Sequence, residues 1–99
     1  MALDLAKEWT KNYRELNPDR TEAHFFGNEI IRQILNQTEC VGIRIYYAID
    51  DKGNQQLLLV GVDGTGNNLL PATQTTDGAD NIIADMSYPC PTYCDPFGL

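Results

Sequence analysis

Apolar and polar positions alternate with two different periods along this chain, and the change of period divides it into elements. Residues 2–16 have the period of an amphipathic helix, with charged residues on the opposite side. Its apolar positions recur at spacings of four, four and three residues: Leu5, Trp9, Tyr13 and Leu16. We expect this helix to end before Pro18, because the residue that precedes a proline is disfavoured in the α region.

A second helix is predicted over residues 20–37. Asp19 is placed as its N-cap, and Glu22 follows three residues later as the return half of a capping box. The apolar stripe consists of Phe26, Ile30 and Ile34, widened by Ile31 and Leu35. Gly27 interrupts it at a cost of about 1 kcal/mol relative to alanine. Either Gly27 marks the close approach of another backbone, or the helix begins near Asn28.

The period then changes to two, and residues 41–63 predict a β-hairpin. Two runs rich in β-branched and aromatic residues flank the segment 50–55, in which Gly53 is placed for a bulged turn. In the first run Arg44 and Tyr46 lie on the face opposite the strongly apolar one. The second run is apolar on both faces, which is typical of a strand between neighbours.

The remaining segments complete an ααβββ order. Residues 64–81 are rich in Gly, Thr and Asn and predict a long loop, and residues 82–88 predict a third strand, with a short helix as the alternative. The tail, 89–99, holds three of the five prolines. This order predicts an α+β fold in a single domain, 1–99, in which two N-terminal helices pack on one face of a small antiparallel sheet.

Several of these segments form a pattern that is found in other sequences. The segments are AHFFG (23–27), CVGIRIYY (40–47), LVGVD (59–63) and PCPTYC (89–94). On these residues the chain resembles a group of short bacterial proteins, mostly of the Bacteroidetes type, that are described as hypothetical. The resemblance covers most of the chain and implies a compact bacterial protein with the same layout. It implies no activity, ligand or catalytic residue.

The charge of the chain disfavours two classes of partner. Seven basic residues oppose fourteen acidic ones, for a net charge of −7, and the basic residues form no cluster. Nucleic acid is disfavoured because neutralising phosphates requires clustered cations. Membrane insertion is disfavoured because no apolar stretch approaches the ~20 residues that span a bilayer. The first eight residues lack a basic region before an apolar block, which predicts a cytoplasmic protein and leaves signal-independent export open.

The sharpest chemical feature is the pair Cys90 and Cys94, separated by three residues. With Cys40 and the single histidine, His24, it completes a Cys₃His set that suits structural zinc. Three thiols packed as small apolar groups, or a disulfide between two of them, are the alternatives. Catalysis is disfavoured because no nucleophile stands in a recognisable context of base and orienting group.

Two functions remain as hypotheses. The first is a non-catalytic structural or interaction protein that self-associates through its sheet edges or its C-terminal tail, because few elements can cover a hairpin with two apolar faces. The candidate interface residues are Arg44, Tyr46, Tyr88, Tyr93 and Phe97. The alternative is a small metal- or thiolate-dependent binding protein. Its zinc ligands would be Cys40, Cys90, Cys94 and His24.

Overall fold

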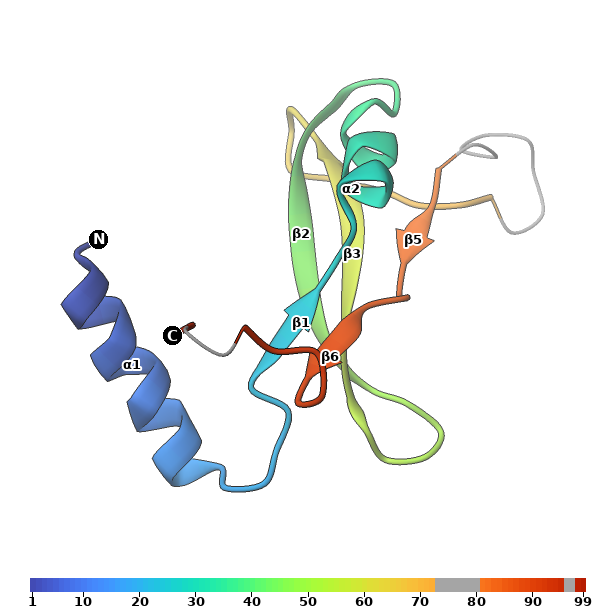
Figure 1. Ribbon diagram of the computed structural model, residues 1–99. Coiled ribbons are helices and arrows are strands. Elements are labelled where there is room, and N and C mark those ends of the chain that lie inside the picture. Colours follow the sequence, from blue (N-terminus) through green and yellow to red (C-terminus); the bar gives the residue numbers. More distant parts are fainter. Residues whose placement is uncertain (73–80, 96–97) are drawn as a thin grey trace. The chain divides into compact units, whose positions relative to one another are not determined.

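The computed structural model describes residues 1–72, 81–95 and 98–99 (Figure 1). The chain is a small α+β protein whose described part holds two helices and two antiparallel sheets, of two and four strands. It divides into two compact units. The first unit combines Met1–Phe25 with Tyr88–Leu99, and the second is Phe26–Ser87.

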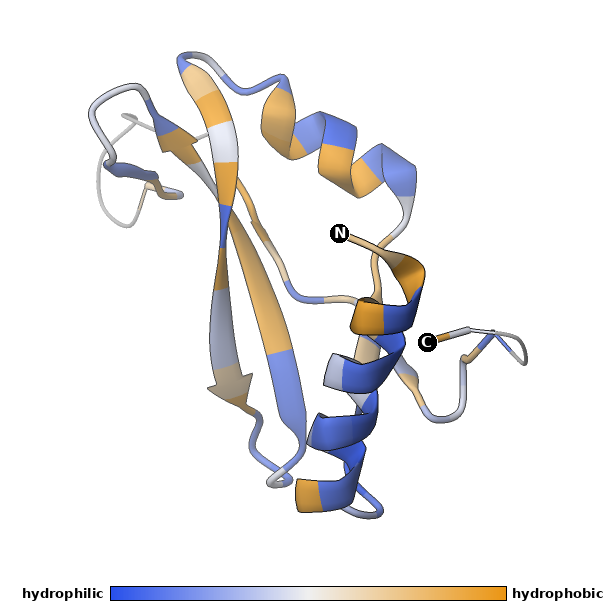
Figure 2. Ribbon diagram, turned by 90° about the vertical axis from the view of Figure 1, so that its left-hand side faces the viewer, coloured by the Kyte–Doolittle hydropathy of each residue, from blue (hydrophilic) through white to orange (hydrophobic). Residues whose placement is uncertain are grey.

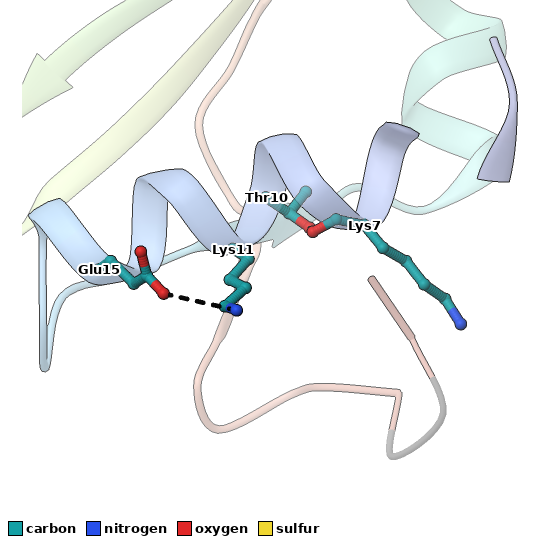
Figure 3. Close-up of polar contacts among 4 residues, drawn as sticks. All are labelled: Lys7, Thr10, Lys11 and Glu15. Carbon is teal, nitrogen blue, oxygen red and sulfur yellow. Dashed lines mark hydrogen bonds and ion pairs between the residues drawn. The ribbon is translucent and has the colours of Figure 1, made fainter. Parts of the chain in front are cut away.

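The first unit contains helix α1 (Leu3–Leu16) and the short strands β1 (Ala23–Phe25) and β6 (Tyr88–Cys90). The two strands pair antiparallel, and Ala23 lies opposite Cys90. No residue of α1 is buried. The polar side of the helix carries an exposed ion pair, 3.7 Å between Lys11 and Glu15 (Figure 3).

The second unit contains helix α2 (Asn28–Leu35) and a sheet built around β3 (Gln55–Asp63). Strand β2 (Cys40–Ile49) pairs with one edge of β3, while β4 (Asn68–Leu69) and β5 (Ile83–Ala84) pair with the other. Figure 2 shows hydrophobic residues along both long strands of this sheet. The core forms where the fully buried Ile34 of α2 packs with Leu59 and Ala84.

The turn between β2 and β3 is organised by one carboxylate. Asp50 Oδ1 accepts the backbone N–H groups of Lys52 and Asn54, both at 2.9 Å. Gly53 has a φ of 83°, a conformation that glycine adopts without a steric cost. The backbone N–H of Asn54, followed by the side-chain amide of Gln56, lowers the pKa of the Asp50 carboxyl. This turn closes the hairpin that the sequence predicts.

The turn between β3 and β4 repeats this arrangement. Asp63 Oδ1 accepts the N–H of Thr65 at 2.9 Å and that of Asn67 at 3.0 Å, and Gly66 has a φ of 90°. Both turns therefore have the sequence Asp-x-x-Gly-Asn. The second one brings Asn68 and Leu69 back along β3, so a strand lies inside the segment predicted to be a loop over 64–81.

The prediction of two N-terminal helices packed on one sheet, in an ααβββ order, is wrong. The described order is α1, β1, α2 and then five strands. Asp19 starts no helix, since its φ is 61°, and Gly27 is extended at the N-cap of α2. The helix predicted over 20–37 is therefore confined to Asn28–Leu35, which confirms the alternative in which it begins near Asn28.

The predicted third strand, over 82–88, contributes to two different sheets. Ile83 and Ala84 form β5 beside β3, whereas Tyr88 begins β6, which pairs with β1. Pro89 lies opposite His24 in this two-stranded sheet. A proline is tolerated there because each strand of a two-stranded sheet has a free edge that needs no donor.

Candidate functional sites

Strand β2 is the longest strand of the second unit, and it has an open edge. β3 pairs with one side of it, and no strand in the described ranges pairs with the other. The N–H of Asp50 donates to Asn54 across the turn, at 2.9 Å. Because this bonding alternates along an antiparallel pair, the even-numbered residues of β2 face β3. The odd-numbered residues from Ile43 to Ile49 therefore present their N–H and C=O groups at the open edge.

The side chains of these odd-numbered residues are uncharged, and most of them are exposed. Ile43 packs against the core, whereas Ile45, Tyr47 and Ile49 are 55%, 84% and 76% exposed. Arg44 is the one charged residue in the ten-residue strand. Such an edge lacks the charges and prolines with which proteins ordinarily prevent strand pairing.

Arg44 and Tyr46, two predicted interface residues, lie on the other face of β2. The Arg44 guanidinium donates to the Gly66 carbonyl at 3.2 Å and to Asn68 Oδ1 at 2.7 Å. The Asn68 amide in turn donates to the Tyr46 hydroxyl at 2.7 Å. This hydrogen bond, assisted by Arg44, lowers the pKa of the Tyr46 phenol. The Arg44 contacts therefore hold the second Asp-x-x-Gly-Asn turn against β2.

The predicted interface residues of the tail form an aromatic cluster in the first unit. The ring of Phe25 lies 6.1 Å from that of Tyr88 and 5.2 Å from that of Tyr93, and the two tyrosine rings are 5.5 Å apart. All three side chains are exposed. Phe97, the last predicted interface residue, lies outside the described residues.

Beside this cluster, two cysteines and a carboxylate come together. Cys90 and Cys94 form a disulfide, which was one of the alternatives for these cysteines. Cys90 is buried, and its Sγ lies 3.5 Å from Glu22 Oε1. The ligand atoms of these three residues all lie within 4.8 Å of one another. In the described part of the chain, this is the only group of three or more His, Cys, Asp or Glu side chains whose ligand atoms lie close enough together to hold a metal ion.

This group differs from the Cys₃His set that the sequence predicts. Cys40 belongs to the second unit, where its thiol donates to the Gly42 carbonyl at 3.2 Å. His24 lies opposite Pro89, so strand alternation turns its side chain away from the face that Ala23 shares with Cys90. Partial burial lowers the pKa of His24.

Sequence reasoning missed Glu22 as a member of this group. Its capping-box spacing from Asp19 placed it in a helix, whereas its backbone N–H donates to the Cys90 carbonyl at 2.8 Å. A weak signal was available, because the polar Glu22 and His24 alternate with the less polar Thr21, Ala23 and Phe25.

No protein-family model, no curated protein and no solved structure matches this chain. No helix in the ranges that the structure describes is long and apolar enough to cross a membrane.

Proposed function

We propose that this chain is a non-catalytic interaction protein that self-associates through β2. In the proposed complex, the open edge of β2 pairs antiparallel with the same edge of a second copy. The observation that carries the proposal is the ten-residue strand with one unpaired edge and exposed, uncharged side chains along it. Main-chain hydrogen bonds supply the pairing, and the alternate side chains supply the specificity.

A second copy suits this edge because antiparallel pairing is self-complementary under a two-fold axis. Antiparallel hydrogen bonding requires the outward-facing, odd-numbered residues to lie opposite one another. One register places Ile43 opposite Ile49 of the other copy and Ile45 opposite Tyr47. It uses every outward position from Ile43 to Ile49. The same register places Arg44 opposite Ala48, so the two guanidinium groups avoid each other.

The expected affinity is modest. Pairing of two strand edges buries less than the ~1,200 Å² of standard stable interfaces. Three exposed side chains per copy, Ile45, Tyr47 and Ile49, still leave water when the strands pair. Burial of apolar surface contributes about 25 cal/mol per Å². We therefore expect a dissociation constant in the micromolar range or weaker.

The test compares two substitutions of Tyr47, whose side chain is largely exposed. Tyr47→Ala keeps the outward N–H, whereas Tyr47→Pro removes it and leaves the bonds between β2 and β3 intact. We expect the wild type and Tyr47→Ala to gain mass with concentration in light scattering during size exclusion, up to about 1 mM chain. We expect Tyr47→Pro to remain monomeric.

The far-ultraviolet circular dichroism of each variant establishes that it is folded. If Tyr47→Pro does not fold, Tyr47→Lys takes its place, because a lysine on an edge strand opposes pairing without removing the N–H. A wild-type chain that is monomeric at every concentration overturns the proposal. The proposal is also overturned if Tyr47→Ala associates no more strongly than the folded variant that blocks the edge, which is Tyr47→Pro or Tyr47→Lys.

A further inference from the structure

The Glu22, Cys90 and Cys94 group lies in the first unit, apart from the strand edge used above. We propose that these three residues form a redox-controlled site for Zn²⁺ or a chemically similar soft divalent cation. The disulfide is the closed state of the site, and reduction by a dithiol opens it. This site is independent of the self-association proposed above.

The position of the carboxylate matches a zinc ligand. A tetrahedral zinc ion with bonds of about 2.0 Å to oxygen and 2.3 Å to sulfur holds those two atoms about 3.5 Å apart. Glu22 Oε1 and Cys90 Sγ are 3.5 Å apart. After reduction, the sulfur of Cys94 needs to move to about 3.8 Å from that of Cys90. The exposed side chain of Cys94 is free to make this movement.

Strand pairing fixes the backbone of two of the three ligand residues, Glu22 and Cys90, before any metal arrives. Cys90 is paired with Ala23 across the two-stranded sheet, and the N–H of Glu22 donates to the Cys90 carbonyl. The N–H of Tyr93 donates to the Pro89 carbonyl at 2.9 Å, which closes the loop that carries Cys94. Metal binding therefore has to order the side chains of Glu22 and Cys94 but not the backbone that carries Glu22 and Cys90.

The donor set selects the class of metal. Two thiolates favour Zn²⁺ and similar soft cations over Mg²⁺ and Ca²⁺, which prefer oxygen ligands. Two thiolates and one carboxylate leave one tetrahedral position for water or another ligand. Three negative charges around a dication leave the site with a net charge of about −1.

Electrons and protons are accounted for in both directions of the switch. A dithiol transfers two electrons and two protons to the S–S bond, is itself oxidised to a disulfide, and leaves Cys90 and Cys94 as thiols. Metal binding then releases one proton from each thiol and forms two metal–sulfur bonds. In the reverse direction, a small disulfide oxidises the two thiolates, is reduced to two thiolates, and frees the cation.

The test is a titration with Co²⁺, which reports bound thiolates through charge-transfer absorption. The chain is reduced with dithiothreitol and desalted without oxygen before Co²⁺ is added. We expect one equivalent to bind per reduced chain, with an absorbance for two thiolates, and none to bind the oxidised chain. We expect Cys94→Ser to abolish the two-thiolate absorption.

Glu22→Gln is expected to weaken Co²⁺ affinity at least about tenfold, since even partners outside the ligand shell are worth that much. The matched control is Cys40→Ser, which removes the third thiol of the chain and is expected to leave the titration unchanged. Absence of binding to the reduced wild type overturns the proposal. Unchanged affinity in Glu22→Gln overturns the role of the carboxylate, and loss of binding in Cys40→Ser overturns the ligand set in favour of one that includes Cys40.

Discussion

Two aspartates and two glycines shape the turns on either side of β3. In each turn, an aspartate carboxylate accepts backbone N–H groups two and four residues later, and a glycine with positive φ occupies the position between them. The carboxylate satisfies donors that the reversing chain cannot pair with backbone carbonyls. Because the same turn occurs before and after β3, the strand that precedes it, β2, and the strand that follows it, β4, both pair with it antiparallel, one on each edge.

The second turn contains two glycines, Gly64 and Gly66, whose substitution tests the role of the positive φ at Gly66. Gly66 has a φ of 90°, whereas Gly64 has no positive φ, and a Cβ would meet nothing within 4 Å at either position. We expect Gly66→Ala to lower the free energy of unfolding by about 1–2 kcal/mol, which is the cost of a left-handed residue with a Cβ. We expect Gly64→Ala to change it by less than about 0.5 kcal/mol. Urea unfolding followed by circular dichroism measures both, and equal effects would contradict the role given to Gly66.

At the scale of elements, β2 and β3 are readily predicted, whereas β1 is not. The hairpin has strict alternation, many β-branched residues and its turn glycine within one continuous segment. Phe26, by contrast, continues the stripe of Ile30 and Ile34 back to the end of β1, and the capping-box spacing of Asp19 and Glu22 predicts a helix start before β1. The strand forms because residues 88–90, far along the chain, pair with it, and local patterns do not contain that information.

The same reason limits prediction of the cysteine and carboxylate group. The cysteines at 90 and 94 are recognisable as a pair from their spacing. Glu22 joins them through the register of β1 against β6, in which Ala23 lies opposite Cys90. A prediction that places Glu22 in a helix cannot bring it to Cys90, so the third ligand candidate is visible only once the sheet is known.

Helix α2 is attached to the sheet of the second unit through Ile34, which is fully buried against Leu59 and Ala84. We expect Ile34→Ala to lower the free energy of unfolding by about 2–5 kcal/mol, because it removes buried methyl groups and leaves a cavity. Leu35, the next residue in the helix, is 44% exposed and serves as the control. Leu35→Ala is expected to cost less than about 1 kcal/mol. Chemical denaturation compares the two, and a larger loss for Leu35→Ala would show that α2 packs through a different face.

At the scale of the whole molecule, the net charge of −7 opposes the association proposed for β2. Each copy carries an excess of acidic residues, while the strand that would form the contact contributes a single charge, that of Arg44. Attraction at the contact then comes from main-chain hydrogen bonds and apolar contacts, which are short-ranged, whereas the charge repulsion between copies is long-ranged. Salt separates these two contributions, because it screens charges beyond a Debye length of about 30 Å at 0.01 M but about 8 Å at 0.15 M.

We therefore expect self-association to strengthen as sodium chloride is raised from about 0.01 to 0.15 M, with the apparent dissociation constant falling roughly severalfold. Sedimentation equilibrium of the wild type at each salt concentration measures this change. Tyr47→Pro carries the same net charge and is expected to remain monomeric throughout, which separates pairing through β2 from nonspecific salting-out. Association of the wild type that weakens with salt would mean that ion pairs hold the copies together, because added salt screens attraction between opposite charges. Such a result would move the contact away from the uncharged edge of β2.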